Sequence, residues 1–349
     1  MPKYINWDES YLNEIENEFF EDRQSRRKRK KKVDHQPKKS EEEIISELAD
    51  ETGIAGGFEM TYSPGEKDHH QNQWLQDSLI SFFYQDLISD VVAMVKGGKE
   101  ASVYRCKAHD TSEKTWLAAK VYRPRMFRNL RNDGMYREGR TALDMNGKEV
   151  NAKDWRALKA MNTGNNRGQA MSHTSWLMYE NKTLRDLYEA GAAVPEPIAV
   201  SENALLMDYI GDEYGPAPTL SEVTIEPHEV EPLFKEVMRN IDIMLQQGLI
   251  HGDLSAYNIL YWNGSIMLID FPQVVNIQNN RHARKILTRD IERVCEYFQN
   301  LGLKVDEQDI ANRLWRAYGV EDTDQEEMLV NILEAVTFDD YEAKEEYDD

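Results

Sequence analysis

The chain has 349 residues, a formal net charge of −21 and a hydrophobic content of 40%. This length suits one two-lobed domain or two ordinary domains with a tail, and the apolar content is sufficient for a buried core. The negative charge of the whole chain disfavours general binding to nucleic acid or to anionic lipid.

The two ends of the chain are polar and strongly charged. Residues 1–70 are predicted to form a charged, largely mobile extension with an unbroken basic run at residues 26–32, and residues 321–349 are predicted to form an acidic tail. The sequence shows neither the apolar core of a signal peptide nor a run of roughly 20 apolar residues that could span a membrane. Cys106 and Cys295 are predicted to be free thiols in a reducing compartment. We therefore expect a cytoplasmic protein without a membrane partner.

Between these ends, the first half of the chain is predicted to mix strands and helices. Residues 123–175 show no sustained period and are rich in Asn, Gly and Arg, so a long flexible insertion is expected there. The expected elements, in chain order, are a helix at 76–88, strands at 92–95, 102–108 and 115–122, a helix around 152–161, a helix at 176–190, and strands at 198–200 and 204–210.

The second half is predicted to be mainly helical. Helices with one apolar face are expected at residues 230–247, 284–301 and 307–318. After the first of them, Asn263-Gly264 joins two strand-like runs, and Asn-Gly is the strongest two-residue hairpin signal. Such a hairpin would return Asp270 to the neighbourhood of Asn258.

The most informative stretch is residues 251–258 with residues 269–272. Asp253 and Asn258 are separated by four residues, as are the catalytic-loop Asp and Asn of protein kinases, and a third polar residue, Asp270, follows twelve residues later. Asp253 would accept or orient the proton of an attacking hydroxyl. Asn258 and Asp270 would hold Mg²⁺, which prefers hard oxygen ligands. We interpret the neighbouring histidine at position 251 as structural and not as a base.

Two further features indicate nucleotide binding. Gly98 lies in a turn between strand-like runs, where backbone N–H groups can approach phosphates, although an ordinary hairpin turn is the better interpretation when this feature is taken alone. Lys120 lies on an alternating strand and could neutralise phosphate charge, with Glu180 as its candidate helix partner. The alternatives are a lysine at a strand edge and a solvated glutamate.

An apolar strand that ends at Gly211 suits a hinge whose backbone binds an adenine edge, and a buried strand without a ligand would look the same. With this hinge, the candidate nucleotide-binding residues are Gly98, Lys99, Glu100, Val103, Lys120, Glu180, Met207, Asp208 and Ile210. The candidate catalytic residues are Asp253 and Asp270, and the candidate metal ligands are Asn258 and Asp270.

In this order, the motifs resemble those of the RIO-type atypical protein kinases over roughly residues 90–300. The matching segments are Gly98-Lys99-Glu100-Ala101 with Val103-Tyr104, Ala119-Lys120-Val121-Tyr122, Trp176 with Glu180, Val194-Pro195-Glu196-Pro197, Leu205-Leu206-Met207 with Ile210-Gly211, Pro216-Ala217-Pro218-Thr219-Leu220, His251-Gly252-Asp253-Leu254-Ser255 with Tyr257-Asn258, and Ile269-Asp270 with Gln273.

The resemblance implies an α+β, two-lobed, protein-kinase-like fold at residues 71–320. A small antiparallel β-sheet N-lobe with one helix would cover about 90–210, and a reduced, mainly helical C-lobe would cover about 211–320. The resemblance also implies ATP and Mg²⁺ as cofactors, with Mn²⁺ as an alternative ion. It implies transfer of the γ-phosphoryl group to Ser or Thr of a protein substrate or of the chain itself, and ATP hydrolysis through a transient phosphate on Asp270. Many members of this family assist maturation of the small ribosomal subunit.

Two other functions remain open at this point. A small-molecule phosphotransferase of the aminoglycoside or choline kinase type shares the His-Gly-Asp motif, but only about forty residues separate Ile210 from His251, which leaves little room for a substrate subdomain. The second alternative is a nucleotide-gated assembly factor that acts mainly as an ATPase. In that case the basic run at residues 26–32 would contact a ribosomal particle or RNA.

Overall fold

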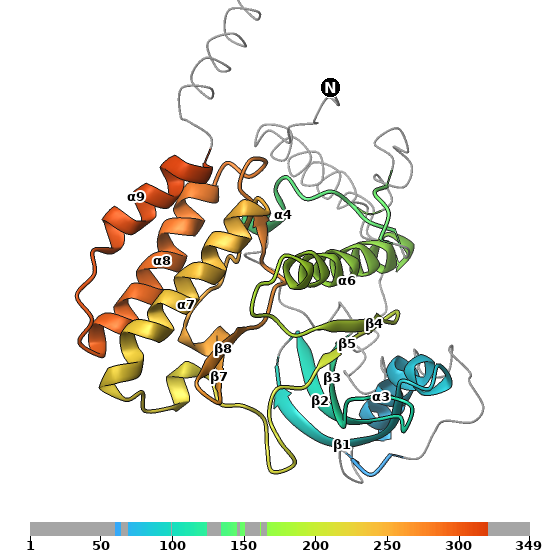
Figure 1. Ribbon diagram of the computed structural model, residues 1–349. Helices are drawn as coiled ribbons and strands as arrows, with labels where there is room; N and C mark the ends of the chain where they lie inside the picture. The colour runs from blue at the N-terminus through green and yellow to red at the C-terminus, as the bar shows by residue number, and fades with distance from the viewer. Residues whose placement is uncertain are drawn as a thin grey trace, which may run out of the picture. The chain divides into compact units, whose positions relative to one another are not determined.

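The computed structural model describes residues 60–63, 69–98, 100–123, 134–144, 147–150, 161 and 166–319 (Figure 1). These residues divide into two compact units. The first unit comprises the described residues up to Tyr188 together with Pro195–Ala217, and the second comprises Glu189–Val194 together with the described residues from Pro218 onward. The basic run, the acidic tail, Lys99 and most of the predicted N-terminal extension lie outside the described part of the chain.

The first unit is built on a five-stranded antiparallel sheet. Its strands are β1 (Ile88–Gly97), β2 (Ala101–Ala108), β3 (Trp116–Tyr122), β4 (Pro197–Val200) and β5 (Ala204–Asp208), in the spatial order β1-β2-β3-β5-β4. The five predicted strands are confirmed, but β1 starts four residues earlier than expected. Register shifts between Ile88 and Asp90 and between Val91 and Ala93 break the two-residue alternation that marks a regular strand.

Different helices cover the two faces of this sheet. α3 (His69–Tyr84) packs on one face and α6 (Asn166–Glu189) lies on the other (Figure 1). The core beneath α3 includes Leu75, Leu79 and Phe82 of the helix and Leu117, Ala119 and Val121 of β3. Because side chains alternate between the two faces of a strand, Lys120 and Tyr122 point to the α6 side.

The bounds of both helices differ from the predicted ones. α3 ends at Tyr84, and Ile88, where the predicted helix ended, instead opens β1. α6 begins at Asn166, ten residues before the predicted start. The added turns are rich in residues of low helix propensity, so local sequence did not indicate them. A tertiary contact holds this part of α6, because the Ser175 hydroxyl accepts the backbone N–H of Leu143 at 2.9 Å.

The predicted insertion at residues 123–175 contains ordered elements in its described part. These elements are α4 (Gly134–Arg137), an isolated β-bridge between Leu143 and Glu149, and the start of α6. The helix predicted around 152–161 lies outside the described residues except for Met161.

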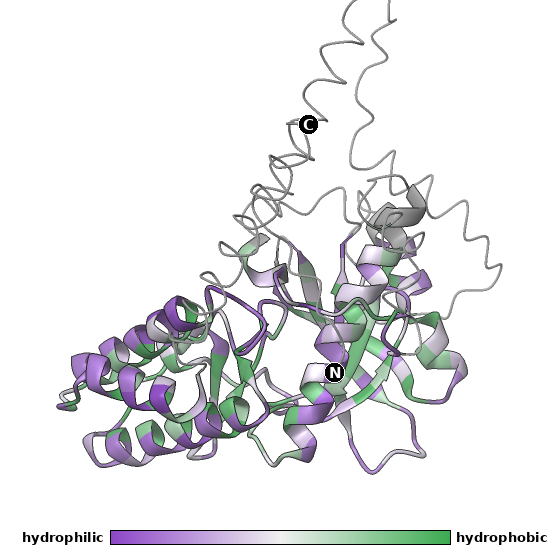
Figure 2. Ribbon diagram, turned by 90° about the horizontal axis from the view of Figure 1, so that it is seen from above, coloured by the Kyte–Doolittle hydropathy of each residue, from purple (hydrophilic) through white to green (hydrophobic). Residues whose placement is uncertain are grey.

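The second unit is mainly helical, as predicted. α7 (Pro227–Gln246), α8 (Ala283–Asn300) and α9 (Glu307–Tyr318) lie side by side (Figure 1) and match the three predicted helices to within a few residues. The short elements are η2 (Leu220–Glu222), β6 (Leu249–Ile250), η3 (Ala256–Asn258), β7 (Ile259–Trp262), β8 (Ser265–Leu268) and β9 (Val275–Asn276), with β6 paired to β9 and β7 to β8. Figure 2 shows hydrophobic residues on the inner sides of the helices and hydrophilic residues on their outer sides.

The predicted hairpin is the β7–β8 pair. Asn263 and Gly264 have φ values of +51° and +80°, so both adopt the left-handed conformation of the type I′ turn that Asn-Gly favours. The hairpin prediction is therefore confirmed.

The segment Glu189–Val194 belongs to the second unit, although its neighbours in sequence belong to the first. Asn240 of α7 is fully buried, and its Oδ1 accepts the backbone N–H of Ala193 at 2.6 Å. The carbonyl of Ala193 in turn accepts the N–H of Leu268 at 2.8 Å. These bonds connect the segment to α7 and to the hairpin.

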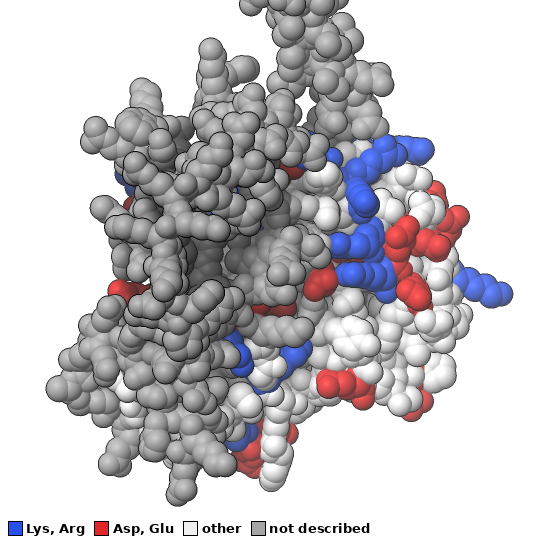
Figure 3. Space-filling view, turned by 180° about the vertical axis from the view of Figure 1, so that it is seen from behind, with Lys and Arg blue, Asp and Glu red and all other residues white. Residues whose placement is uncertain are grey.

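The predicted α+β class is confirmed by an antiparallel sheet with helices in one unit and a helical second unit. None of the helices in the described ranges has the length and apolar character needed to cross a membrane. On the face that Figure 3 shows, Lys and Arg side chains lie next to Asp and Glu side chains, so the described surface there is mixed in charge.

Candidate active site

Lys120 of β3 and Glu180 of α6 form a buried ion pair. The Nζ of Lys120 lies 2.7 Å from Oε1 of Glu180, and the two residues are 8% and 3% exposed. β3 lies inside the sheet, where Lys120 is directly opposite Val103 of β2 and Leu205 of β5. The predicted pairing is confirmed, and the alternatives of an edge lysine and a solvated glutamate are wrong. A role in nucleotide binding stays a prediction.

Tyr122 completes the surroundings of Glu180, and the sequence did not predict this role. Its hydroxyl donates to Oε2 of Glu180, and the Nζ of Lys120 lies 5.5 Å from the centre of its ring. Trp176 of α6 packs edge-on against the same ring, with 4.7 Å between the ring centres. The available signal was position, because Tyr122 is two residues after Lys120 and therefore faces the same side of the strand.

The turn between β1 and β2 requires the predicted glycine. A Cβ atom on Gly98 would lie 2.6 Å from the carbonyl oxygen of Ala101, which is closer than real Cβ contacts. After this turn, the backbone carbonyl of Glu100 accepts the backbone N–H of Arg123 at 2.9 Å, and Val103 is half-buried. These contacts explain the glycine by backbone packing alone. Phosphate binding by Gly98, Glu100 and Val103 stays a prediction.

Near the end of the predicted hinge strand, Asp208 takes part in a cluster of one lysine and two carboxylates. The ammonium of Lys114 contacts the carboxylate of Asp208 and lies 2.5 Å from Oε2 of Glu196. Partial burial opposes ionisation of this amine, but its hydrogen bonds to the two carboxylates outweigh burial and raise the pKa of Lys114. The backbone N–H of Asp208 donates to the carbonyl of Glu196 at 2.9 Å. The carboxylate and the backbone N–H of Asp208 are thus engaged within the first unit, and adenine recognition by Met207, Asp208 and Ile210 stays a prediction.

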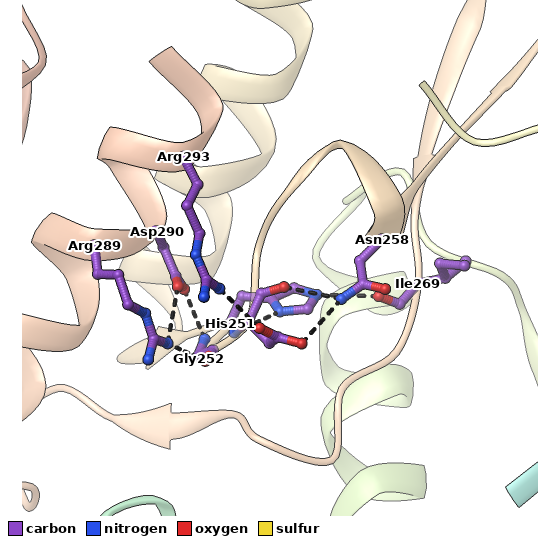
Figure 4. A network of polar contacts seen from close by, with 8 residues as sticks. His251, Gly252, Asn258, Ile269, Arg289, Asp290 and Arg293 are labelled. Atoms are coloured by element: carbon purple, nitrogen blue, oxygen red, sulfur yellow. Dashed lines mark hydrogen bonds and ion pairs between the residues drawn. The ribbon is translucent and has the colours of Figure 1, made fainter. Parts of the chain in front are cut away.

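Asp253 and Asn258 lie side by side in the segment between β6 and β7. The Asn258 Nδ2 donates to the backbone oxygen of Asp253 at 2.9 Å and lies 3.4 Å from its carboxylate Oδ2 (Figure 4). Asn258 is the last residue of the one-turn helix η3, and it is 7% exposed. The bonds to Nδ2 identify Oδ1 as the side-chain atom that can bind a metal.

The hairpin returns the chain to Asn258, as predicted. The backbone N–H of Ile269 donates to the carbonyl of Asn258 at 3.0 Å, so Asp270 follows directly on the residue that is bonded to Asn258. Asp270 is exposed and has a φ of +72°. This left-handed conformation is uncommon outside glycine, although Asp tolerates it better than most residues.

His251 is structural, as the sequence interpretation stated. It is 2% exposed and packs against Phe271 with 5.0 Å between the ring centres. Its Nδ1 accepts the backbone N–H of Asp253 at 3.3 Å, so its Nε2 donates to the carbonyl of Ile269 at 3.1 Å. His251 therefore connects the residue before Asp270 to Asp253 and positions both carboxylates.

α8 holds the turn that precedes Asp253, and the sequence did not predict this contact. Asp290 is 2% exposed and accepts the backbone N–H of Gly252 at 2.7 Å, while Arg289 donates to the Gly252 carbonyl. Burial raises the pKa of Asp290, and the nearby His251 ring, the Arg289 guanidinium and the backbone N–H of Gly252 offset it only in part. An acidic residue on the buried face of an otherwise apolar helix stripe was the signal that could have found it.

Arg293 of α8 binds the side chain of Asp253. Its NH1 lies 2.8 Å from Oδ1 of Asp253, and both side chains are 41% exposed. Figure 4 shows Arg289 and Arg293 extending from the same helix toward the segment around Gly252. The proposed proton acceptor is thus paired with a cation within the second unit.

The donors of Asn258 and Asp270 fit a magnesium ion. Within the described ranges, no group of three or more His, Cys, Asp and Glu side chains is arranged to hold a metal by itself. Mg²⁺ is commonly bound through one or two carboxylates together with water and the phosphates of the substrate. An amide oxygen and an exposed carboxylate on adjacent segments meet that requirement.

Known proteins with similar sequences are kinases by name. The RIO-type serine/threonine-protein kinase Rio1 of Haloferax volcanii is 31% identical over 215 residues, which are 61% of this chain and 64% of that protein. The Serine/threonine-protein kinase RIO1 of Caenorhabditis elegans is 26% identical over 65% of this chain and 40% of that protein. The chain therefore spans less than two thirds of the length of these relatives. Their names agree with the kinase function expected from the sequence.

Among solved structures, the Rio2 kinase-ADP/Mg²⁺-phosphoaspartate complex from Chaetomium thermophilum is similar at a TM-score of 0.47 and 17% identity, over 79% of this chain and 86% of that one. A family model described as the RIO domain matches residues 102–310, which is well over half of the chain and includes Lys120, Glu180, Asp253, Asn258 and Asp270. The resemblance seen in the motifs is thus confirmed, and the chain belongs to the RIO domain family.

Proposed function

We propose that this protein is an ATP- and Mg²⁺-dependent phosphotransferase that transfers the γ-phosphoryl group to a Ser or Thr hydroxyl of a protein or of its own chain. The arrangement of Asp253, Asn258 and Asp270 is the observation that supports this proposal most directly. The Asn258 amide binds the backbone oxygen of Asp253, and the N–H of Ile269, next to Asp270, binds the carbonyl of Asn258. The buried pair of Lys120 and Glu180 supports it independently, since a helix carboxylate that fixes a lysine of the sheet is suited to positioning its ammonium for phosphate binding.

In the proposed reaction, the acceptor hydroxyl oxygen attacks the γ-phosphorus of ATP. The bond between this phosphorus and the β,γ-bridging oxygen breaks, and ADP leaves. The hydroxyl proton passes to the carboxylate of Asp253 and then to solvent. Lys120 would neutralise phosphate charge, and Asn258 and Asp270 would hold the ion. Bound Mg²⁺ would neutralise charge on the phosphates, and Mn²⁺ could replace it.

Hydrolysis of ATP through a phosphate on Asp270 is part of the same proposal. Asp270 is exposed and has a left-handed backbone, and residues with such strained conformations often cluster at functional sites. Its carboxylate oxygen would attack the γ-phosphorus in place of a hydroxyl, and water would later cleave the acyl phosphate. An acyl phosphate is destroyed by hydroxylamine, whereas a phosphate on Ser or Thr survives that treatment.

The partners are also proposals. Contact with a ribosomal particle or RNA would use the basic run at residues 26–32, and a cytoplasmic location remains the expectation from composition. Removal of residues 23–39 should then reduce co-sedimentation with ribosomal particles and make the remaining binding less sensitive to salt.

The decisive experiment is incubation of the full chain with γ-labelled ATP and Mg²⁺, followed by mapping of the label before and after hydroxylamine treatment. We expect label on the protein and release of ADP. Asp253→Asn should lower the rate by at least roughly 100-fold while the affinity for ATP changes little. Wild-type turnover in the Asp253→Asn variant would overturn the assignment.

A further inference from the structure

We propose that Arg293 makes this protein select acceptor hydroxyls that have acidic neighbours. The inference rests on the proposed phosphotransferase function and adds its substrate class. Arg293 pairs with Asp253. A carboxylate on the substrate would bind the Arg293 guanidinium instead, and Asp253 would then be able to accept the proton of the acceptor hydroxyl.

The carboxylate of Asp253 is engaged on both oxygens before any substrate binds. Arg293 holds Oδ1 at 2.8 Å, and Asn258 approaches Oδ2 at 3.4 Å. An acceptor hydroxyl that donates to Asp253 must compete with these groups. Of the two, Arg293 is the stronger competitor, because charge-assisted hydrogen bonds are the stronger class.

Arg293 can leave Asp253 without disturbing the backbone around it. Both partners of this pair are 41% exposed, and ion pairs with such exposure are weak. The backbone is held separately, since Asp290 and Arg289 bind the N–H and the carbonyl of Gly252. α8 thus contains one arginine that holds the backbone and another that holds only the side chain of Asp253.

A carboxylate is the group best suited to draw Arg293 away. The planar fork of a guanidinium matches two carboxylate oxygens, so an acidic residue beside the acceptor would replace Asp253 as its partner. Lys285, Arg289 and Arg293 are spaced four residues apart along α8 and therefore share one side of the helix. Arg289 in this row is engaged with Gly252 and Asp290, but its charge still adds to the positive potential along this side of α8, which favours several acidic residues in succession over a single one.

The chain itself contains acceptors of this kind. Ser40 is followed by three glutamates at residues 41–43, and Thr323 lies between Asp322 and Asp324. Such hydroxyls are the expected sites of self-phosphorylation. A short peptide with the sequence of residues 36–45 has Ser40 as its single hydroxyl-bearing residue and provides a simple probe.

The test compares this peptide with one that has glutamine in place of the three glutamates. We expect the wild-type protein to phosphorylate the acidic peptide with a kcat/KM at least about tenfold higher. Arg293→Gln should reduce this preference about fivefold, the upper range for an exposed pair, because phosphorylation of the neutral peptide rises while that of the acidic peptide falls. Arg293→Lys should give an intermediate preference, since it keeps the charge without the planar fork.

Arg313→Gln on α9 is the matched control. Arg313 forms an exposed pair with Asp309 of the same helix at 3.0 Å and has no bond to Asp253 among the described contacts. This variant should retain the wild-type preference, and unfolding measurements on all variants would show that the fold is kept. A purely structural Arg293 would change the rates for both peptides equally and leave their ratio unchanged.

Three results would overturn the inference alone while the protein still turns over ATP. These are an equal preference in wild type and Arg293→Gln, a wild-type preference for the neutral peptide, and failure to label the acidic peptide. Absence of any ATP turnover or labelling by the wild-type protein would overturn the proposed function as well.

Discussion

The backbone N–H of Gly252 donates to the buried carboxylate of Asp290 at 2.7 Å. This bond joins the turn before Asp253 to α8, and neither of the two residues has a place in the proposed chemistry. Gly252 has a φ of +83°, and a Cβ atom at this position would overlap the carbonyl of Gln273. The position of Asp253 thus depends on a glycine without space for a side chain and on an acid without access to water.

Gly252→Ala should destabilise the protein much more than Gly264→Ala. Both glycines have a φ near +80°, so both substitutions carry the left-handed strain of about 1–2 kcal/mol. Gly264 has open space around its Cβ position, whereas Gly252 meets the Gln273 backbone. Urea unfolding of the two variants measures the difference. Equal losses of unfolding free energy in the two variants would show that the backbone at Gln273 moves aside at no energetic cost.

Asp290→Asn should lose less stability at neutral pH than near pH 4. Because burial raises the pKa of Asp290, its stabilising contribution is complete below the unfolded value of about 3.9 and is lost as the pH rises through the folded value. The asparagine keeps an oxygen for the Gly252 N–H but does not titrate. The free energy of unfolding of both proteins, measured from pH 4 to pH 7, should therefore converge. A gap that widens with pH would contradict the raised pKa.

Glu180→Gln should cost about 3 kcal/mol of stability, because it leaves the Lys120 ammonium buried without a countercharge. Tyr122→Phe removes only one hydrogen bond to the same carboxylate and should cost about 1 kcal/mol. Replacing the pair by Lys120→Met with Glu180→Leu should recover part of the stability. Denaturant unfolding measures all three. If Glu180→Gln lost no more unfolding free energy than Tyr122→Phe, the Lys120 ammonium would have to be solvated in that variant.

Asp270→Asn should raise the Mg²⁺ concentration needed for half-maximal turnover by at least roughly tenfold. The substitution keeps the shape of the side chain and removes the charge that attracts the ion. Asp309→Asn, an exposed acid on α9, serves as the control and should leave the Mg²⁺ dependence unchanged. Titration of activity with Mg²⁺ at fixed ATP tests both. An unchanged midpoint in Asp270→Asn would remove this residue from the proposed ligand set.

Neither cysteine should react with a thiol reagent in the native protein. Cys106 and Cys295 are fully buried, and burial raises the pKa of Cys106 to about 12 and that of Cys295 to about 11. Because the thiolate is the reactive species, modification at pH 8 should be at least about a hundredfold slower than in denaturant. A Cys295→Ser variant should show half as many reactive thiols in denaturant as the wild type. A fast native phase would indicate local opening of β2 or α8.

The sequence was most informative where chemistry depends on local spacing. Asp253, Asn258 and Asp270 are linked by a single hairpin, so the turn signal at Asn263-Gly264 was sufficient to bring them together. Lys120 and Glu180 are far apart in sequence. Their pairing followed from the order of the motifs, and the structure shows why it holds, since β3 presents the lysine toward α6.

The residues that the sequence did not indicate act through tertiary contacts. Asp290 and Arg293 reach the Asp253 segment from a helix that begins thirty residues after it, and no local pattern encodes that approach. Only the place of Asp290 on the apolar stripe of α8 distinguished it from a solvated acid. The early start of β1 was missed for a different reason, because bulges remove the alternation by which strands are recognised.

The segment Glu189–Val194 has a consequence for attempts to divide this protein. The chain passes from one unit to the other at three places, so no single cut separates them. A fragment that starts at Pro218 would keep α7 and the hairpin but lose Ala193, leaving the buried amide of Asn240 and the N–H of Leu268 with unmet hydrogen bonds. The helical half should therefore be expressed together with residues 189–194, either fused to it through a linker or by circular permutation, before its own stability is measured.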